Sequence, residues 1–182
     1  MAPDAACMSL PRPSPTSVVA SCALALAVAA VPAQAGGLPG RVDKVLDGDS
    51  LVFRPDGGGK PLEVRLHGID APEGCQAGGP EAREYLLSVT QNQPATLQTK
   101  GRDTYGRTLG VLTVDGLVVN QRLVAEGHAW SLRTKWNQGP YVAQEKVAVA
   151  LKRGLHAERG AVPPWEFRRT NGRCGAASAP AR

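Results

Sequence analysis

Acidic and arginine side chains concentrate between residues 47 and 73 of the 182-residue chain. The first group, Asp47-Gly48-Asp49-Ser50, lies between two short apolar runs. Arg65 lies in the next apolar run, and Asp70 and Glu73 follow its end. A second arginine, Arg107, comes later in a polar loop. Carboxylates bind hard divalent cations and arginines bind phosphate oxygens, so these residue types predict a metal-assisted attack on a phosphodiester.

Asp49 and Asp70 are the candidate cation ligands. Because no cysteine or histidine cluster accompanies them, their hard oxygens favour Ca²⁺ or Mg²⁺ over zinc. Asp47-Gly48-Asp49 does not begin an EF-hand, since the later acidic positions and the closing glutamate are missing. The triplet alone is typical of a solvated turn, in which Gly48 is expected to supply a positive φ. By itself it therefore says little about a metal.

The apolar pattern predicts five short strands, over residues 41–46, 50–54, 62–66, 95–99 and 108–114. Helices are predicted from Pro80, where proline suits a first turn, and over residues 119–126 and 140–153. Five strands with a helix between the third and fourth match the order of a five-stranded OB-type barrel. Periodicity alone supports only a small α+β domain with a twisted antiparallel sheet.

Residues 1–35 are interpreted as an export signal. An apolar run from Val18 to Val31 is too short for a transmembrane helix. It is followed by Ala33-Gln34-Ala35, the small-x-small pattern of signal peptidase, and Met8 is an alternative start. The mature chain would comprise a flexible leader at 36–40, a globular domain at 41–160 and an extended Pro/Arg/Ala-rich tail at 161–182. The sequence thus predicts a secreted or periplasmic protein.

Charge and cysteine usage bear on the partner and the compartment. The formal net charge is +5, which suits a polyanion such as nucleic acid, although many basic proteins bind none. Removal of the signal would leave Cys75 and Cys174 as the two cysteines. In an exported protein such a pair favours a disulfide, with two free thiols as the alternative. A bridge would hold Pro163-Pro164-Trp165 near Glu73.

Four motifs carry a resemblance to a known family. They read VLDGDS (45–50), VRLHGIDAPE (64–73), DTYGR (103–107) and VNQRLVAEG (119–127). In this order they resemble the staphylococcal nuclease (thermonuclease) family over residues 41–155. The resemblance implies a five-stranded OB-fold barrel with three α-helices. It also implies calcium-dependent hydrolysis of DNA and RNA that cleaves the 5′ P–O bond and leaves 3′-phosphates.

The resemblance also implies a cation site. Asp49 and Asp70 stand where the family has its calcium carboxylates. Ala71 stands where a backbone carbonyl binds the metal. Ser50 replaces the usual threonine after the second aspartate of the first motif, and it keeps a hydroxyl. The expected cofactor is therefore Ca²⁺.

The catalytic and substrate-binding residues follow from the same comparison of motifs. Glu73 stands where a carboxylate activates or orients the attacking water. Arg65 and Arg107 stand where two arginines bind the scissile phosphate. Tyr105 stands where a tyrosine touches the phosphate of the bound nucleotide. Trp136 lies in a region that contacts the base in the family, and it could stack there.

These residues together predict an exported, calcium-dependent nuclease. It would act as a monomer on DNA and RNA, with single strands preferred, and without stable membrane association. Taken singly, Arg65 and Arg107 are typical of surface positions, so only the combination predicts catalysis. The first alternative is an inactive OB-fold module that binds nucleic acid or protein. The second is a calcium-binding structural protein of the periplasm.

Overall fold

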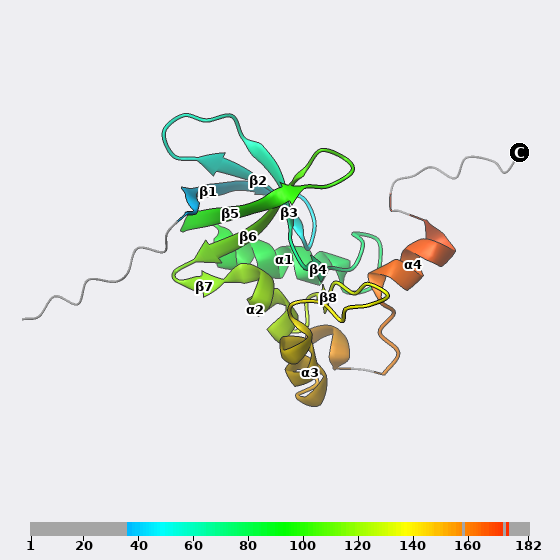
Figure 1. The fold of residues 1–182 in the computed structure, drawn as a ribbon. Coiled ribbons are helices and arrows are strands. Elements are labelled where there is room, and N and C mark those ends of the chain that lie inside the picture. Colours follow the sequence, from blue (N-terminus) through cyan, green and yellow to red (C-terminus); the bar gives the residue numbers. More distant parts are fainter. Residues whose placement is uncertain (1–35, 158, 173, 175–182) are drawn as a thin grey trace, which may run out of the picture. The chain divides into compact units, whose positions relative to one another are not determined.

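Five strands close into a barrel in the computed structural model, which describes residues 36–157, 159–172 and 174 (Figure 1). The barrel strands are β1 (Leu38–Val45), β2 (Ser50–Pro55), β3 (Leu62–Leu66), β5 (Pro94–Arg102) and β6 (Thr108–Val114). They are ordered β3-β2-β1-β5-β6, and a parallel pairing between β3 and β6 joins the two edges. The predicted α+β fold with a five-stranded OB-type barrel is confirmed.

Strand alternation places the core inside the barrel. In β3, Val64 and Leu66 are buried, whereas Glu63 and Arg65 point away from the core. Strand β6 alternates in the same way along its whole length. Buried strand residues therefore form one apolar cluster with residues of the helices, including Leu51, Phe53, Val64, Leu97, Leu112, Leu86 and Leu123. The charged positions of the same strands are left to line the outside.

Helices and short strands complete the described part of the domain. The helices are α1 (Gly79–Thr90), α2 (Val119–Ala125), α3 (Val142–Ala150), the 3₁₀ helix η1 (Gly154–His156) and α4 (Pro164–Asn171). The short strands are β4 (Ile69–Asp70), β7 (Leu117–Val118) and β8 (Trp130–Ser131). The first three helices correspond to the three predicted ones. None of the helices among the described residues is long and apolar enough to cross a membrane.

The prediction of an extended tail at 161–182 was wrong where α4 forms. Proline occupies the first turn of α4, Glu166 lies in that turn, and Arg168 and Arg169 lie in the last turn. These charges complement the helix dipole, which a reading based on proline and arginine content overlooks. Residues 173 and 175–182 of the predicted tail lie outside the described part of the chain.

The predicted flexible leader at 36–40 was also partly wrong. Leu38, Pro39 and Gly40 belong to β1 and pair with Leu97, Thr96 and Ala95 of β5. The strand therefore begins three residues before its predicted start, because β5 offers a partner that the local sequence does not reveal. The predicted export signal at 1–35 lies outside the described residues.

A buried asparagine ties α2 to the barrel end that carries the site. The Asn120 amide donates to the backbone oxygens of His67 (2.9 Å) and Gly110 (3.1 Å). Its Oδ1 accepts a bond from the backbone N–H of Leu112 at 3.0 Å. Because Asn120 is fully buried, these bonds give its amide group the hydrogen-bond partners that water cannot supply there. The contact fixes His67 in the connection between β3 and β4, and Asp70 is the last residue of β4.

Candidate active site

Most of the predicted site residues line one cavity of about 490 Å³. They are Asp49, Arg65, Ala71, Glu73, Tyr105 and Arg107. Barrel strand β3 supplies Arg65, and the turns before β2 and β6 supply Asp49 and Arg107. Glu73 lies in the loop between β4 and α1. Segments far apart in the sequence thus meet at one end of the barrel.

Arg65 bridges the two predicted cation ligands. Its Nη1 donates to Oδ1 of Asp49 at 2.5 Å, and its Nη2 donates to Oδ1 of Asp70 at 2.9 Å. The Asp49 and Asp70 side chains are only 4% and 1% exposed. The structure therefore brings Asp49 and Asp70 to the two sides of a single guanidinium.

The turn before β2 holds Asp49 in place. Oδ1 of Asp47 accepts a bond from the backbone N–H of Asp49 at 2.9 Å. Oδ2 of Asp49 in turn accepts a bond from the backbone N–H of Ala71 at 2.9 Å. Asp47 thus shapes the turn, and the Asp49 side chain ties the turn to the chain after β4.

The expected reason for Gly48 in this turn was wrong. Gly48 is not among the described residues with positive φ. A Cβ atom at this position would instead lie 2.7 Å from Cβ of Ala71 and 2.8 Å from Cβ of Ala82. The glycine is needed because the turn packs directly against the loop after β4 and against α1.

Burial sets the electrostatics of the pair formed by Asp49 and Arg65. Loss of hydration raises the pKa of Asp49 to about 7, against the opposing attraction of Arg65. Burial disfavours the charged form of Arg65, but the neighbouring Asp49 and Asp70 carboxylates outweigh it and raise the pKa of the guanidinium. Arg65 therefore stays charged, and the carboxylate of Asp49 favours additional positive charge beside it.

Arg107 is positioned by the turn between β5 and β6. Nε of Arg107 donates to Oδ2 of Asp103 at 2.8 Å, and the backbone N–H of Arg107 donates to Oδ1 at 2.9 Å. Nη1 of Arg107 lies 3.5 Å from the hydroxyl of Ser50, which donates to Asp49 at 3.1 Å. The ring of Tyr105 lies below the guanidinium, with its centroid at 5.6 Å. Asp103 was not among the predicted site residues, although it belongs to the DTYGR motif.

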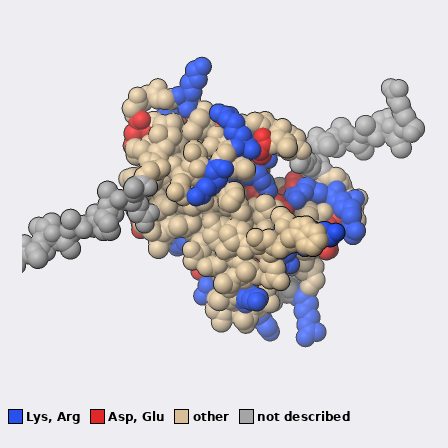
Figure 2. Space-filling model, in the orientation of Figure 1, with Lys and Arg blue, Asp and Glu red and all other residues tan. Residues whose placement is uncertain are grey.

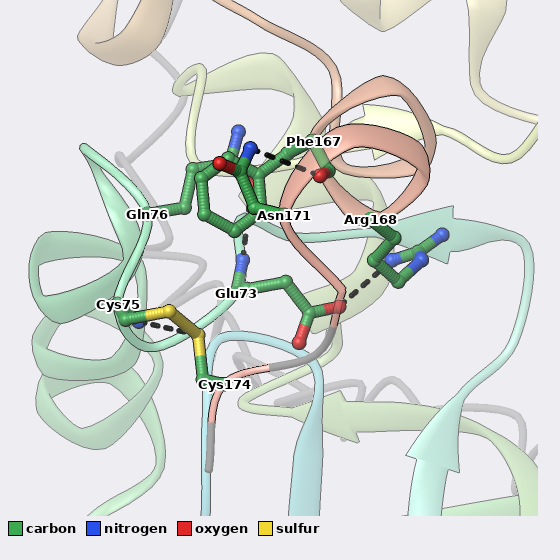
Figure 3. Close-up of a disulfide and its surroundings, with 7 residues drawn as sticks. All are labelled: Glu73, Cys75, Gln76, Phe167, Arg168, Asn171 and Cys174. Atoms are coloured by element: carbon green, nitrogen blue, oxygen red, sulfur yellow. Dashed lines mark hydrogen bonds and ion pairs between the residues drawn. A yellow bond between two sulfur atoms is a disulfide. The ribbon is translucent and has the colours of Figure 1, made fainter. Parts of the chain in front are cut away.

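Arg168 of α4 is a second site residue that the sequence did not predict. Its Nη2 donates to Oδ2 of Asp70 at 2.7 Å, and its Nη1 lies 3.1 Å from Oδ1 of Asp70. Nη1 also donates to Oε1 of Glu73 at 2.9 Å (Figure 3). The hydrogen bond to Asp70 raises the pKa of Arg168, with Glu73 adding to the effect and partial burial opposing it. No local motif around Arg168 predicted this placement, because only the tertiary path of the tail brings it here.

The tail is joined to the Glu73 loop by a disulfide. Cys75 and Cys174 are bonded in the structure and lie beside Glu73 (Figure 3). In the same loop, Oε1 of Gln76 lies 3.2 Å from the backbone N–H of Glu73, which donates to it. Cys174 and Arg168 both line the cavity. The C-terminal segment is therefore one wall of the candidate site.

Asp70 does not line the cavity itself but contacts Arg65 and Arg168, which do. Trp136 is a further predicted site residue that does not line the cavity. Its side chain is 87% exposed, and the Nζ atom of Lys135 lies 4.8 Å from its ring centroid. The aromatic residue that does line the cavity is Tyr105, which is 65% exposed. A base that stacks near the cavity would therefore meet Tyr105 first.

The donor atoms fit a hard cation. Among the described residues, no three His, Cys, Asp or Glu side chains lie together in a group that could hold a metal ion. Two buried carboxylates, Asp49 and Asp70, nevertheless face one guanidinium, and Ala71 adds backbone next to them. Ca²⁺ accepts such oxygen donors and completes its shell with water. In the wider surroundings, basic side chains lie over the barrel strands and around α4 (Figure 2).

Comparison with known proteins places the chain in a family. Residues 63–158 match the family model described as "Staphylococcal nuclease homologue". A protein of Shigella flexneri named "Micrococcal nuclease" is 37% identical over 158 residues, which are 79% of this chain and 87% of that protein. An "Uncharacterized endonuclease" of Escherichia coli is 35% identical over 147 residues, which are 80% of this chain and 94% of that protein.

A plant relative is similar over a smaller part of its length. A "Probable staphylococcal-like nuclease" of Oryza sativa subsp. japonica is 38% identical over 111 residues. These residues are 60% of this chain but only 33% of the rice protein. The residues that match the family model include β5, β6 and the helices α1, α2 and α3. The chain belongs to the staphylococcal nuclease homologue family.

Proposed function

We propose that the protein is an exported, calcium-dependent nuclease that hydrolyses phosphodiester bonds of DNA and RNA. The observation that carries the proposal is that Asp49, Arg65, Glu73 and Arg107 line one cavity, with the buried Asp70 in contact with Arg65. The printed names of the relatives, among them a micrococcal nuclease and an endonuclease, point to the same chemistry. The finer parts of the proposal are the cation, the bond that is cleaved and the compartment.

Asp49, Asp70 and the backbone carbonyl of Ala71 would hold Ca²⁺. When bound, the cation would neutralise charge on a phosphate oxygen and gather water near the phosphorus. The guanidinium groups of Arg65 and Arg168 beside the two aspartates support this assignment, since buried carboxylates require positive charge next to them. The donor set also lacks the thiolate or imidazole groups that zinc prefers.

Arg65 and Arg107 would bind the phosphate that is attacked. A guanidinium presents two N–H groups in a fork that matches two phosphate oxygens, and it stays charged at any working pH. Negative charge grows on those oxygens in the transition state, so the two arginines lower its energy more than that of the bound substrate. Both arginines line the same cavity as Glu73, which supports this role.

Glu73 would orient or deprotonate the attacking water. The water oxygen forms a bond to phosphorus, and the bond from phosphorus to the 5′ oxygen breaks. The 5′ oxygen takes up a proton, so the products are a 3′-phosphate and a 5′-hydroxyl. A carboxylate is a suitable acceptor for the proton of the water.

The matched pair Glu73→Gln and Glu63→Gln tests the catalytic proposal. Glu63 is an exposed residue of β3 on the barrel surface. We expect Glu73→Gln to lower kcat on single-stranded DNA by about 10²- to 10⁴-fold, because the amide cannot accept the proton. Glu63→Gln should retain the wild-type kcat. If wild type and Glu73→Gln both bind the DNA but leave it intact, the protein is an inactive binding module.

The remaining parts of the proposal concern substrate form, assembly and export. We propose that single strands are preferred, which the exposed Tyr105 ring beside the cavity supports because unpaired bases can stack on it. We also propose a monomer without stable membrane association, released by cleavage after Ala35. N-terminal sequencing of the exported protein should give Gly36 as the first residue, and the intact N-terminus would contradict this.

A further inference from the structure

Arg168 occupies the oxygens that a cation would need. Both oxygens of Asp70 lie within hydrogen-bond distance of the Arg168 guanidinium, at 2.7 and 3.1 Å. The same guanidinium reaches Oε1 of Glu73 at 2.9 Å. Because the Asp70 side chain is 1% exposed, there is little room for water or a cation beside this contact. One side chain thus contacts a proposed cation ligand and the proposed catalytic carboxylate together.

The segment that carries Arg168 is fixed at both ends. Before α4, the backbone oxygen of Val162 accepts a bond from Nε2 of Gln76 at 2.6 Å. Within α4, the ring of Trp165 lies edge-on to Trp130, with centroids 6.4 Å apart. After α4, Cys174 is bonded to Cys75 in the Glu73 loop (Figure 3). Arg168 is therefore held over the carboxylates by the fold of the tail.

We infer that Arg168 is a tethered competitor of the divalent cation, so that α4 must withdraw its guanidinium before the cation site is complete. The inference rests on the calcium site of the proposed function. Two positive groups that need the same Asp70 oxygens cannot occupy them together. Arg65 contacts only Oδ1 of Asp70, so removal of Arg168 without replacement would leave Oδ2 without its charged partner, which is costly at a buried site. The cation therefore takes the place of the guanidinium in one exchange.

The exchange determines the apparent affinity for the cation. If only a fraction of molecules has Arg168 withdrawn, the apparent dissociation constant rises by the inverse of that fraction. The coupling is reciprocal, so the bound cation must loosen α4 by the same factor. The disulfide opposes withdrawal, because it limits how far α4 can move from the Glu73 loop. Loss of the disulfide should therefore tighten cation binding in the same direction as loss of Arg168.

Calorimetric titration with Ca²⁺, without nucleic acid, tests the competition. We compare wild type with Arg168→Ala, Arg168→Gln and the control Arg169→Ala. Arg169 is the next residue of α4 and is exposed. Both Arg168 variants should bind Ca²⁺ about tenfold more tightly than wild type, within the range of about 5- to 150-fold usual for coupled equilibria. Arg169→Ala should bind as wild type does.

Three outcomes would overturn the inference, and they differ in what else they imply. Equal calcium affinity in wild type and both Arg168 variants would overturn the competition and leave the calcium site intact. Unchanged affinity together with weaker binding of single-stranded DNA would instead make Arg168 a phosphate-binding residue. Absence of calcium binding in every variant would overturn both the proposed calcium site and this inference.

The role of the disulfide between Cys75 and Cys174 is tested separately. The double variant Cys75→Ala/Cys174→Ala removes the bridge without leaving a free thiol at either position. It should bind Ca²⁺ several-fold more tightly than wild type, and wild-type affinity would overturn the contribution of the bridge. Hydrogen exchange provides the reciprocal measurement. Addition of Ca²⁺ to wild type should speed exchange of the amides of α4, and slower exchange would contradict the withdrawal of the helix.

Discussion

Arg65 contacts both proposed cation ligands, whereas Arg107 contacts neither directly. Arg107 reaches Asp49 only through the hydroxyl of Ser50, and its own orientation depends on Asp103. The two arginines therefore have different tasks at the residue scale. Arg65 is part of the charge balance of the cation site, and Arg107 is a separate positive group aimed into the same cavity.

Asp103 is predicted to be a positioning residue for Arg107. Asp103→Asn keeps an oxygen for the backbone N–H groups of the turn but weakens the charged contact to Nε of Arg107. Because a misplaced catalytic group loses rate steeply, kcat should fall by about 10- to 100-fold. Steady-state kinetics of this variant and of Asp56→Asn, an exposed acid in the β2–β3 hairpin, measure the effect.

A double-variant cycle separates positioning from a general loss of stability. Asp103→Asn should have little further effect on kcat in an Arg107→Ala background, because the group it positions is already gone. Equal losses of kcat in the presence and absence of Arg107 would contradict the positioning role.

The pKa of Asp103 is lowered by its hydrogen bonds to Arg107, although burial opposes the shift. Asp103 is therefore charged throughout the neutral range.

Some residues of the site can be predicted from the sequence and others cannot. Residues of the first three motifs line the cavity, whereas the fourth motif supplies Asn120, which ties α2 to the barrel. Asp103 was within reach, because it lies in the same turn motif as Arg107. Arg168 was not, because its contact with Asp70 spans 98 residues and depends on the path of the tail.

At the scale of elements, the turn before β2 is held by contact with the loop after β4 and with α1. Gly48 lies where these segments meet, and the space for a side chain there is already filled by Ala71 and Ala82. The packing explains why a short turn can place Asp49 reproducibly. It also makes the site dependent on residues that take no part in the chemistry.

Gly48→Ala should therefore lower the free energy of unfolding by about 1–3 kcal/mol, because the added methyl group overpacks the contact. Gly74→Ala is the matched control, since a Cβ atom there would have no neighbour within 4 Å. The control should change stability by about 0.5 kcal/mol or less. Urea unfolding of both variants measures the difference, and equal stability of the two would contradict the packing account.

Element prediction succeeded where periodicity was local and failed where pairing was remote. The strands at 62–66 and 108–114 have the predicted bounds, because alternation of buried and exposed residues sets them. The start of β1 at Leu38 depends on β5, more than fifty residues later, and was missed. Helix α4 was missed because a short helix with one proline before it and another at its first residue resembles an extended segment in composition.

At the scale of the whole molecule, the pH dependence of stability should carry a contribution from one half-buried histidine, His128. His128 stacks on Tyr85 with ring centroids 4.1 Å apart, and burial lowers its pKa below 6.5 despite the charge of Glu126 and Glu81. The unfolded chain therefore takes up a proton before the folded protein does. The contribution of His128 to the free energy of unfolding is therefore present above pH 6.5 and is lost as the pH falls below that value.

The difference between wild type and His128→Phe isolates this contribution. Asp49, whose pKa is raised by burial, acts in the opposite direction, and it is common to both proteins. Urea unfolding from about pH 8 to about pH 5.5 should show wild type losing stability relative to His128→Phe as the pH falls. Parallel profiles for the two proteins would contradict a lowered pKa of His128 in the folded protein.

The central claim is that the cavity binds Ca²⁺ and uses it to cleave nucleic acid. The most direct measurement is cleavage of end-labelled single-stranded DNA during a calcium titration, with analysis of the product ends. We predict that cleavage rises with calcium, stops when a chelator is added, and leaves 3′-phosphates and 5′-hydroxyls. DNA that stays intact at every calcium concentration, or cleavage that continues at the same rate in chelator, would contradict the claim.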